Sequence, residues 1–215
     1  MKRRLFATLA LVMALGSLTP PGTVQASIVS RFSYSDRTAE AAFSSVDASN
    51  CIVTQVFLFA TKSRSSTSSG SKVLLSEANI SIFKFDQCAE PESNPVLLDA
   101  NGGPISLSKL DFRIGDGLSW ARLNKTINVY DFVSDGAFDV TVAMYWIGSG
   151  SLTAKNNRSI FTSARCTTVT QDQGATRPST AWGSVSDGIT NYTPEPAVST
   201  ELALIKSGEL TRGCT

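Results

Sequence analysis

Beyond residue 26 the chain alternates between short apolar runs and clusters of Gly, Pro, Asn, Asp and Ser, without a strongly amphipathic helical segment. The runs are about 6–12 residues long and are punctuated as β-strands are. The candidate strands are Ser27–Tyr34, Glu40–Val46, Ile52–Thr61, Asn79–Asp86, Val96–Asp99, Leu118–Phe132, Ala137–Ile147, Arg158–Cys166, Ala181–Thr190 and Ala197–Lys206. This pattern predicts an all-β fold, an antiparallel β-sandwich or barrel-like structure of about ten strands that forms one domain over residues 27–215.

Three segments lie outside these strands. Thr167–Thr180, which contains Gln171-Asp172-Gln173-Gly174, is predicted to be an exposed loop. Thr193–Pro196 is predicted to be a rigid turn, because each of its two prolines fixes φ and removes a backbone donor. Lys109–Ile114 is apolar but too short to assign.

The clearest local feature is a hairpin between Leu118 and Gly148. Asp135-Gly136 is a favoured two-residue turn, and it predicts that Ser134 lies directly opposite Ala137. In that register one face is apolar, with Leu123, Ile127, Val129 and Val133 opposite Gly148, Met144, Val142 and Phe138. Lys125, opposite Trp146, interrupts this face near its rim. A slip by one residue would turn the apolar set toward solvent, so the pattern indicates which face is buried.

The other face of this hairpin combines aromatic and polar side chains. Aromatic rings stack on the C–H faces of sugars, while Asn, Arg and Asp supply directed hydrogen bonds. The predicted ligand-binding residues are Trp120, Arg122, Asn124, Asn128, Tyr130, Asp139 and Tyr145. The alternative is that the rings pack across the strands and are covered by further chain.

The N-terminus has the three parts of a secretory signal peptide. Lys2–Arg4 is a charged segment, Leu5–Leu18 is an apolar run too short to span a bilayer comfortably, and Val24–Ala26 offers small residues for cleavage. We expect residues 1–26 to be removed and the mature chain to begin at Ser27. No later apolar run reaches membrane length, so the mature chain is expected to be secreted, in the extracellular space or a periplasm, without stable insertion into a membrane.

Four cysteines follow the predicted cleavage site, and an even number in an exported chain indicates disulfides. Cys51 opens one strand-like run and Cys88 closes the next, with Ser63–Ser71 between the runs as a hairpin tip. Antiparallel pairing across that tip brings both sulfurs to the same end, which predicts a Cys51–Cys88 bond. A Cys166–Cys214 bond then follows by elimination.

Composition narrows the classes of function. The 215 residues include no histidine, which excludes Ser-His-Asp and Cys-His catalysis and His-ligated metals. Removal of residues 1–26 takes away three bases and no acid, so the net charge falls from +1 to about −2. A chain with that charge lacks a basic footprint, and we expect no nucleic-acid partner.

Acidic side chains offer two further chemistries. Oxygen ligands for Ca²⁺ are present in Asp111, Asp116, Asp131, Asp135 and Asp139. However, Asp135 belongs to the predicted turn, while Asp131 and Asp139 fall on opposite faces of the hairpin, so no metal or other cofactor is predicted. A carboxylate-dependent glycosidase needs two acids close together in a cleft. The acids in predicted loops are Glu77, Asp86, Glu90, Glu92, Asp116 and Asp187.

These patterns favour a secreted, non-enzymatic module that binds a ligand or a surface, with a glycan as one kind of partner. Two alternatives remain open. One is a secreted glycoside hydrolase or lyase that uses carboxylates, and the other is a structural component of an envelope or matrix that assembles through sheet edges. A contiguous exposed aromatic patch favours the first reading, an acid pair in a concavity the second, and concentration-dependent assembly the third.

Overall fold

A computed structural model describes residues 28–89, 95–163 and 166–214 of the chain, and it has the all-β antiparallel fold that the sequence predicts. The ten strands are β1 (Ile28–Asp47), β2 (Ile52–Thr67), β3 (Lys72–Asp86), β4 (Val96–Ser106), β5 (Phe112–Ile114), β6 (Trp120–Asp131), β7 (Gly136–Gly148), β8 (Thr153–Thr162), β9 (Thr167–Ser186) and β10 (Ser199–Cys214). A short 3₁₀ turn, η1 (Asp116–Leu118), precedes β6. Within the described ranges no helix is long and apolar enough to cross a membrane. The predicted signal peptide and its cleavage site lie outside these ranges.

The hydrogen-bonded path through the strands closes on itself. Its order is β10-β1-β2-β3-β4-β6-β7-β9-β8, with β5 beside β6 and an additional pairing between β9 and β10. The closure depends on β9, whose residues 167–178 pair with β10 and whose residues 179–186 pair with β7. The edge strand β8 pairs with the first half of β9. A single strand therefore belongs to both layers of the molecule.

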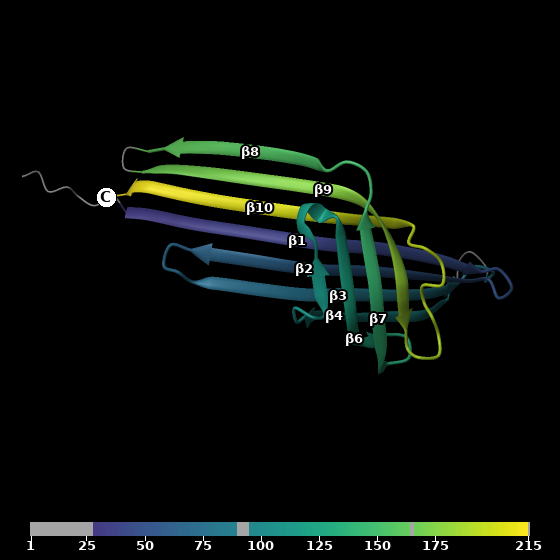
Figure 1. Cartoon of the computed structure of the whole chain (residues 1–215). Helices are drawn as coiled ribbons and strands as arrows, with labels where there is room; N and C mark the ends of the chain where they lie inside the picture. The colour runs from purple at the N-terminus through teal and green to yellow at the C-terminus, as the bar shows by residue number, and fades with distance from the viewer. Residues whose placement is uncertain (1–27, 90–94, 164–165, 215) are drawn as a thin grey trace, which may run out of the picture.

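The two layers are a long sheet and a smaller sheet that crosses one of its faces (Figure 1). Strands β8, β9, β10, β1, β2, β3 and β4 form the long sheet, and β5, β6, β7 and the end of β9 form the second layer. The buried apolar side chains of the long sheet include Ala39, Ala41, Phe43, Val56, Leu58, Ala60, Ala78, Ile80, Ile82 and Leu202. Those of the second layer include Ala121, Leu123, Ile127, Val129, Val140, Val142, Met144, Trp146 and Val185. This part of the molecule is sandwich-like.

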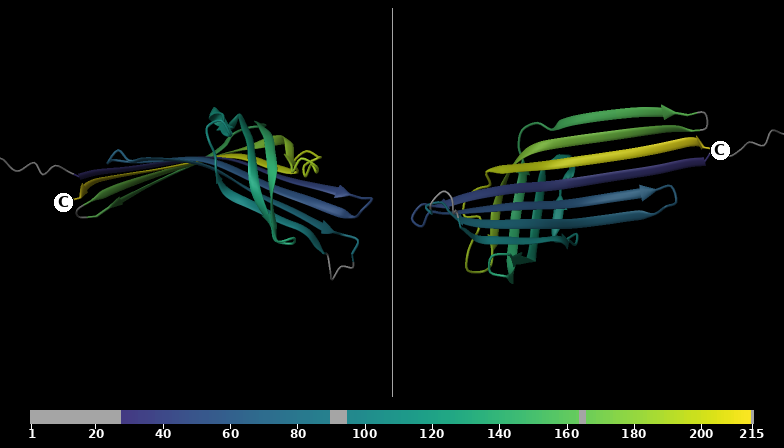
Figure 2. Two further views of the ribbon diagram at one scale, coloured as in Figure 1. Left: turned by 90° about the horizontal axis from the view of Figure 1, so that it is seen from below. Right: turned by 180° about the vertical axis from the view of Figure 1, so that it is seen from behind.

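The long sheet continues beyond the second layer as a single layer, which we call the extension (Figure 2). It comprises residues 28–37, 62–67, 72–76, 153–162, 167–174 and 205–214. Solvent reaches both of its faces, and every residue of β8 is exposed. Because the extension has no second layer to bury apolar surface, its backbone ladders and cross-strand side-chain pairs hold it together.

The strands of the extension are longer than the hydrophobic pattern predicts. The predicted loop Thr167–Thr180 belongs to β9, so that prediction was wrong. The predicted hairpin tip Ser63–Ser71 is largely strand, because β2 runs to Thr67 before the chain turns. A strand that meets water on both sides needs no alternation of apolar and polar residues, and Thr is well suited to a pleated surface. A polar composition is typical of loops in a strand-and-loop pattern, but in the extension it does not distinguish a loop from a strand.

The β6–β7 hairpin forms, but in a different register from the one predicted. Asp131 lies opposite Gly136 and Lys125 lies opposite Val142, so residues 132–135 make a four-residue turn. The buried Asp131 carboxylate causes this, since it accepts hydrogen bonds from the Val133 and Ser134 amides at 3.0 and 3.2 Å. Relative to the predicted pairing the register moves by four residues, an even number, so the buried and exposed faces are as predicted. Only the end of the apolar face differs, where Val133 is exposed.

The predicted Cys51–Cys88 disulfide is confirmed. Its Cα atoms are 5.5 Å apart at the common end of β2 and β3, where Ile52 lies opposite Asp86. For the second predicted bond the backbone register is compatible, because Thr167 lies opposite Arg212 and so brings Cys166 and Cys214 to the same end of β9 and β10. The Cys214 side chain lies outside the described part of the structure, and the Cys166–Cys214 bond stays a prediction.

Candidate functional site

The residues predicted to bind a ligand lie on the outer surface of the second layer, which faces away from the long sheet. Directly opposite pairs on this surface are Trp120–Ile147, Arg122–Tyr145, Asn124–Ala143 and Asn128–Asp139. The exposed members of the predicted set are Arg122, Asn124, Asn128, Tyr130 and Asp139, while Trp120 and Tyr145 are half-buried. The surface is thus open to solvent.

One end of this surface holds a concavity of about 230 Å³, which we call the outer groove. Arg122, Asn124, Tyr145 and Trp182 line it, and its floor includes Ala143 and Gly183. Gly183 has φ +144°, and a Cβ atom there would lie 2.0 Å from the Ala143 carbonyl oxygen. Only glycine fits at this position, and it allows β9 to approach β7 closely at the floor of the groove.

Two aromatic rings stand together at the outer groove. Trp182 of β9 lies directly opposite Tyr145 of β7, with ring centroids 5.1 Å apart and planes inclined by 51°. Arg122 of β6 lies opposite Tyr145 on its other side, so a guanidinium, a phenol and an indole form one row across three strands. The Trp182 side chain is 46% exposed and presents much of its surface to solvent.

Sequence reasoning did not include Trp182 in the site. It falls within the candidate strand Ala181–Thr190, where its outward direction follows from alternation with the buried Ala181 and Val185. What the sequence lacked was any sign that this strand pairs with β7. That pairing joins residues far apart in the chain, and no turn motif in the sequence predicts it.

The remaining predicted residues lie toward the other end of the surface and bond to one another. The Asn128 amide donates to the Asp139 carboxylate at 2.9 Å. The Tyr130 hydroxyl donates to Asp135, which raises the pKa of Tyr130, and its ring meets Phe132 edge-on at 5.2 Å. Asn128 is four residues beyond Asn124, or about 13 Å along a strand. The predicted set therefore divides into a groove end and a turn end.

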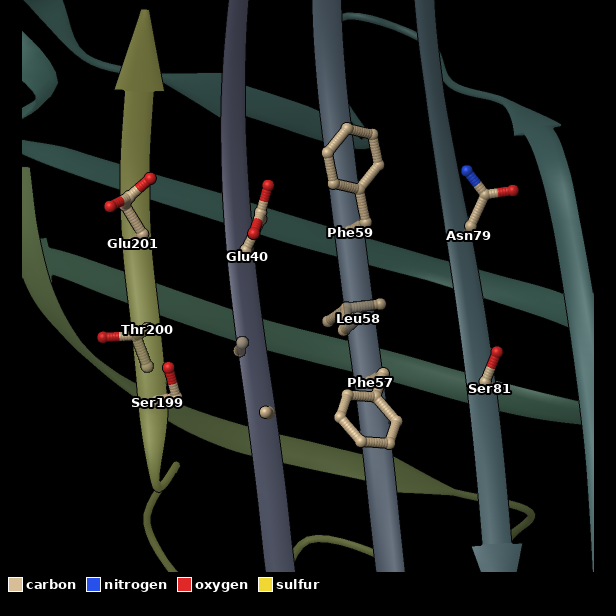
Figure 3. A pocket seen from close by; sticks show the side chains of 11 residues that line it. Glu40, Phe57, Leu58, Phe59, Asn79, Ser81, Ser199, Thr200 and Glu201 are labelled. Atoms are coloured by element: carbon tan, nitrogen blue, oxygen red, sulfur yellow. The ribbon is translucent and has the colours of Figure 1, made fainter. Parts of the chain in front are cut away.

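A second concavity, the back groove, lies on the face of the long sheet turned away from the second layer (Figure 3). It has a volume of about 300 Å³, and its lining includes Glu40, Phe57, Phe59, Asn79, Ser81 and Glu201. Glu40 of β1 lies directly opposite Glu201 of β10. Partial burial, followed by the neighbouring Glu201 carboxylate, raises the pKa of Glu40.

Three of the acids that the sequence suggested for catalysis form hydrogen bonds or ion pairs with nearby groups. Asp116 forms an ion pair with Arg37 at 3.0 Å. The Asp187 carboxylate accepts the Thr190 amide at 2.7 Å and the Tyr192 hydroxyl at 2.6 Å, and these bonds lower the pKa of Asp187. Asp86 accepts the amide of Cys88. Glu77 lies in β3 and not in a loop, and Glu90 and Glu92 lie outside the described residues.

The aspartates considered as Ca²⁺ ligands are likewise dispersed. Asp131 is occupied by donors of its turn, Asp139 bonds to Asn128, and Asp111 forms an ion pair with Lys125 at 3.2 Å. Over the described ranges, no three His, Cys, Asp or Glu side chains gather where they would hold a metal ion.

Comparison with protein-family models found no match, and comparisons with curated proteins and with solved structures also found none. Any statement about function must accordingly come from the surfaces of the molecule itself.

Proposed function

We propose that the mature protein is an exported, non-enzymatic binding module, and that the outer groove holds a sugar residue of a glycan. The observation that carries this proposal is the exposed Tyr145–Trp182 ring pair with Arg122 and Asn124 beside it. Rings supply flat apolar surface for the C–H faces of a sugar, and the guanidinium and amide are donors for its hydroxyl groups. A groove of about 230 Å³ on an open face suits one sugar unit of a glycan whose neighbouring units continue past the groove.

Export is part of this proposal. It is supported by the charged, apolar and small-residue segments at the N-terminus and by the Cys51–Cys88 disulfide, a bond that persists in oxidising compartments.

The test is a glycan array probed with the oxidised protein beginning at Ser27, followed by titration of the best ligand. Trp182→Ala and Tyr145→Ala are expected to weaken binding by about tenfold or more, since each removes a stacking surface worth about 1–3 kcal/mol by analogy with bases on aromatic rings. Phe132→Ala is the matched control, because Phe132 is an exposed ring outside the groove. Equal binding by all three variants would refute the site.

A carboxylate-dependent hydrolase is the second candidate, favoured by the Glu40–Glu201 pair in the back groove. Directly opposite residues have Cβ atoms about 4.5–5.5 Å apart, compatible with the roughly 5–10 Å between glycosidase carboxylates. One acid with a raised pKa beside another is also the arrangement of a proton donor and its partner. Release of reducing sugar by the wild type, abolished in both Glu40→Gln and Glu201→Gln, would establish this activity. Release that persists in both variants would remove it.

A structural component that assembles through sheet edges is the third candidate. The observation in its favour is β8, an exposed edge strand that pairs with β9 on one side. Sedimentation that remains monomeric as the concentration rises would contradict it.

A further inference from the structure

The extension separates charge between its two faces. Seven of its exposed cations project from the side on which the second layer packs, and we call this side the basic face. They are Arg31 of β1, Lys62 and Arg64 of β2, Lys72 of β3, Arg158 of β8, and Lys206 and Arg212 of β10. The ladder register fixes this assignment. One row across the strands reads Arg158, Gln171, Gly208, Ser33, Ser66 and Lys72, and the next contains Gln173, Lys206, Ser35 and Arg64.

The second layer confirms which side this is. Arg37 belongs to the same set of alternating positions, and it forms its ion pair with Asp116 of η1 at 3.0 Å. Arg177, also on this side, donates to the Gly117 carbonyl oxygen of the same turn. Farther out along the extension, no described cation of the basic face has an acidic partner.

The acids of the extension occupy the opposite face. Asp36, Asp172 and Glu209 are at the intervening positions of β1, β9 and β10, where the only described base is Lys155 of β8. Water-facing surfaces ordinarily intersperse the two signs. On the basic face Lys62 lies directly opposite Arg37, whose charge Asp116 of η1 offsets.

A groove runs along the basic face beside the missing side chain of Gly208. Its volume is about 420 Å³, and Arg64, Lys206, Gln171, Gln173, Ser33 and Ser66 are among the residues that line it. Arg64 and Lys206 lie on opposite sides of Ser35, two strand spacings or about 10 Å apart. Two cations thus flank a floor of hydroxyl and amide groups.

We propose that the basic face binds an anionic polysaccharide, with a carboxylate or sulfate group held between Arg64 and Lys206. The hydroxyl and amide groups of the groove then bond to the sugar hydroxyls, and the outer cations follow the chain along the sheet. This surface is separate from the outer groove, and the inference does not depend on the function proposed there.

The shape of the molecule favours a chain over a membrane. The second layer rises from one half of this face, as the left view of Figure 2 shows. Packed sheets lie about 10 Å apart, so a planar bilayer resting on the second layer would stand clear of the basic face. A flexible polymer, in contrast, fits into the angle between the second layer and the basic face and reaches the cations there.

The chemistry of the face favours a polysaccharide over single-stranded nucleic acid. Proteins that bind single strands stack the bases on aromatic rings. The described aromatic residues of the extension, Phe32, Tyr34 and Phe161, are at positions that point to the opposite face. Hydroxyl and amide side chains instead match a ligand rich in hydroxyl groups.

The experiment measures binding of the oxidised protein to heparin, to a polyuronate and to neutral dextran at two salt concentrations. Heparin or the polyuronate is expected to bind, more weakly at high salt because screening acts on exposed charges, whereas dextran is not expected to bind. Arg64→Glu/Lys206→Glu is expected to lose about tenfold or more in affinity, which corresponds to about 1.4 kcal/mol. Lys155→Glu, on the opposite face, is expected to bind as the wild type does, whereas Lys206→Glu, which makes the same change in net charge on the basic face, is expected to bind more weakly.

A milder pair, Arg64→Gln/Lys206→Gln, keeps the test meaningful if charge reversal unfolds the extension. Trp182→Ala, which removes a ring of the outer groove, is expected to leave polyanion binding intact, so failure of one site is distinguishable from failure of the other. Equal loss in the matched control would overturn the proposal. Stronger binding to duplex DNA or to anionic phospholipid vesicles than to both polysaccharides would also overturn it.

Discussion

The indole N–H of Trp146 donates a 2.9 Å hydrogen bond to the backbone carbonyl oxygen of Glu40 and thereby joins the two layers of the protein. Trp146 is fully buried in the second layer, and the residues flanking Glu40 in β1 are the small, buried Ala39 and Ala41. The large side chain of one sheet thus packs against the small ones of the other.

Replacing Trp146 with Phe is expected to lower the free energy of unfolding by about 1–3 kcal/mol, because the Glu40 carbonyl oxygen loses a buried donor. Urea denaturation measures the change. Trp182→Phe is the matched control, with an expected change within about 0.5 kcal/mol at a site that is 46% exposed. Equal effects of the two substitutions would show that the bond contributes nothing.

Gly183→Ala is expected to destabilise the protein. The new methyl group would meet the Ala143 carbonyl oxygen at 2.0 Å in a backbone conformation that strains any other residue, at a cost of about 1–3 kcal/mol or more. Gly174→Ala in the same strand meets no atom within 4 Å and should leave the melting temperature nearly unchanged. A Gly183→Ala protein as stable as that control would disprove the close approach.

Removal of the Cys51–Cys88 bond by the double substitution Cys51→Ser/Cys88→Ser is expected to cost about 2–4 kcal/mol in unfolding free energy. The loosening should be greatest where Ile52 and Asp86 pair, which hydrogen exchange of backbone amides resolves. Peptide mapping without reduction tests the second bond at the same time. The expected fragment links Cys166 to Cys214, and a fragment linking Cys51 to either of them would contradict the strand pairing.

Stability is expected to fall as pH rises through the titration of Glu40. Its pKa is above the ordinary value of 4.5 in the folded protein, so the folded state binds more protons than the unfolded state between the two values. Glu201→Gln removes one of the charges that raise this pKa, and the fall between pH 4 and pH 7 should then be smaller. Glu209→Gln, on the same strand and face, is the control for urea titrations across this range.

N-terminal processing provides a test that needs no purified ligand. The exported protein is expected to begin at Ser27, because small residues precede that position. Sequencing that finds Met1, or any start before Pro20, would contradict cleavage there.

The sequence was informative wherever one side of a strand is buried. In β6 and β7 the alternation of Leu123, Ile127 and Val129 with polar residues identified both faces, and the outward face is the one with the candidate groove. The turn was less predictable, since the choice between two and four residues depended on hydrogen bonds that the Asp131 carboxylate accepts from amides of its own turn and from the Asp99 amide across the sheet.

Where both sides of a strand meet water, the pattern failed. Segment 167–174 reads as a loop by composition, and only its ladders with β8 and β10 make it a strand. The basic face was hidden for the same reason. The net charge of the chain is near zero because it sums basic and acidic side chains over the whole surface. The two sets of charges can be assigned to separate faces only when the strand register is known, since it places Arg64 and Asp172 on opposite faces of the extension.

The position of β10 between β9 and β1 constrains how the chain acquires its structure. The first described residue of β1, Ile28, lies opposite Cys214 of β10, so one edge of β1 stays open until synthesis has delivered the strand β10. Such distant pairing gives a high contact order and slow closure. During that interval the open edge offers unpaired amides and carbonyls to other chains. We therefore expect the newly made polypeptide to rely on a holding chaperone, and to acquire its native stability in one late step when the last strand docks.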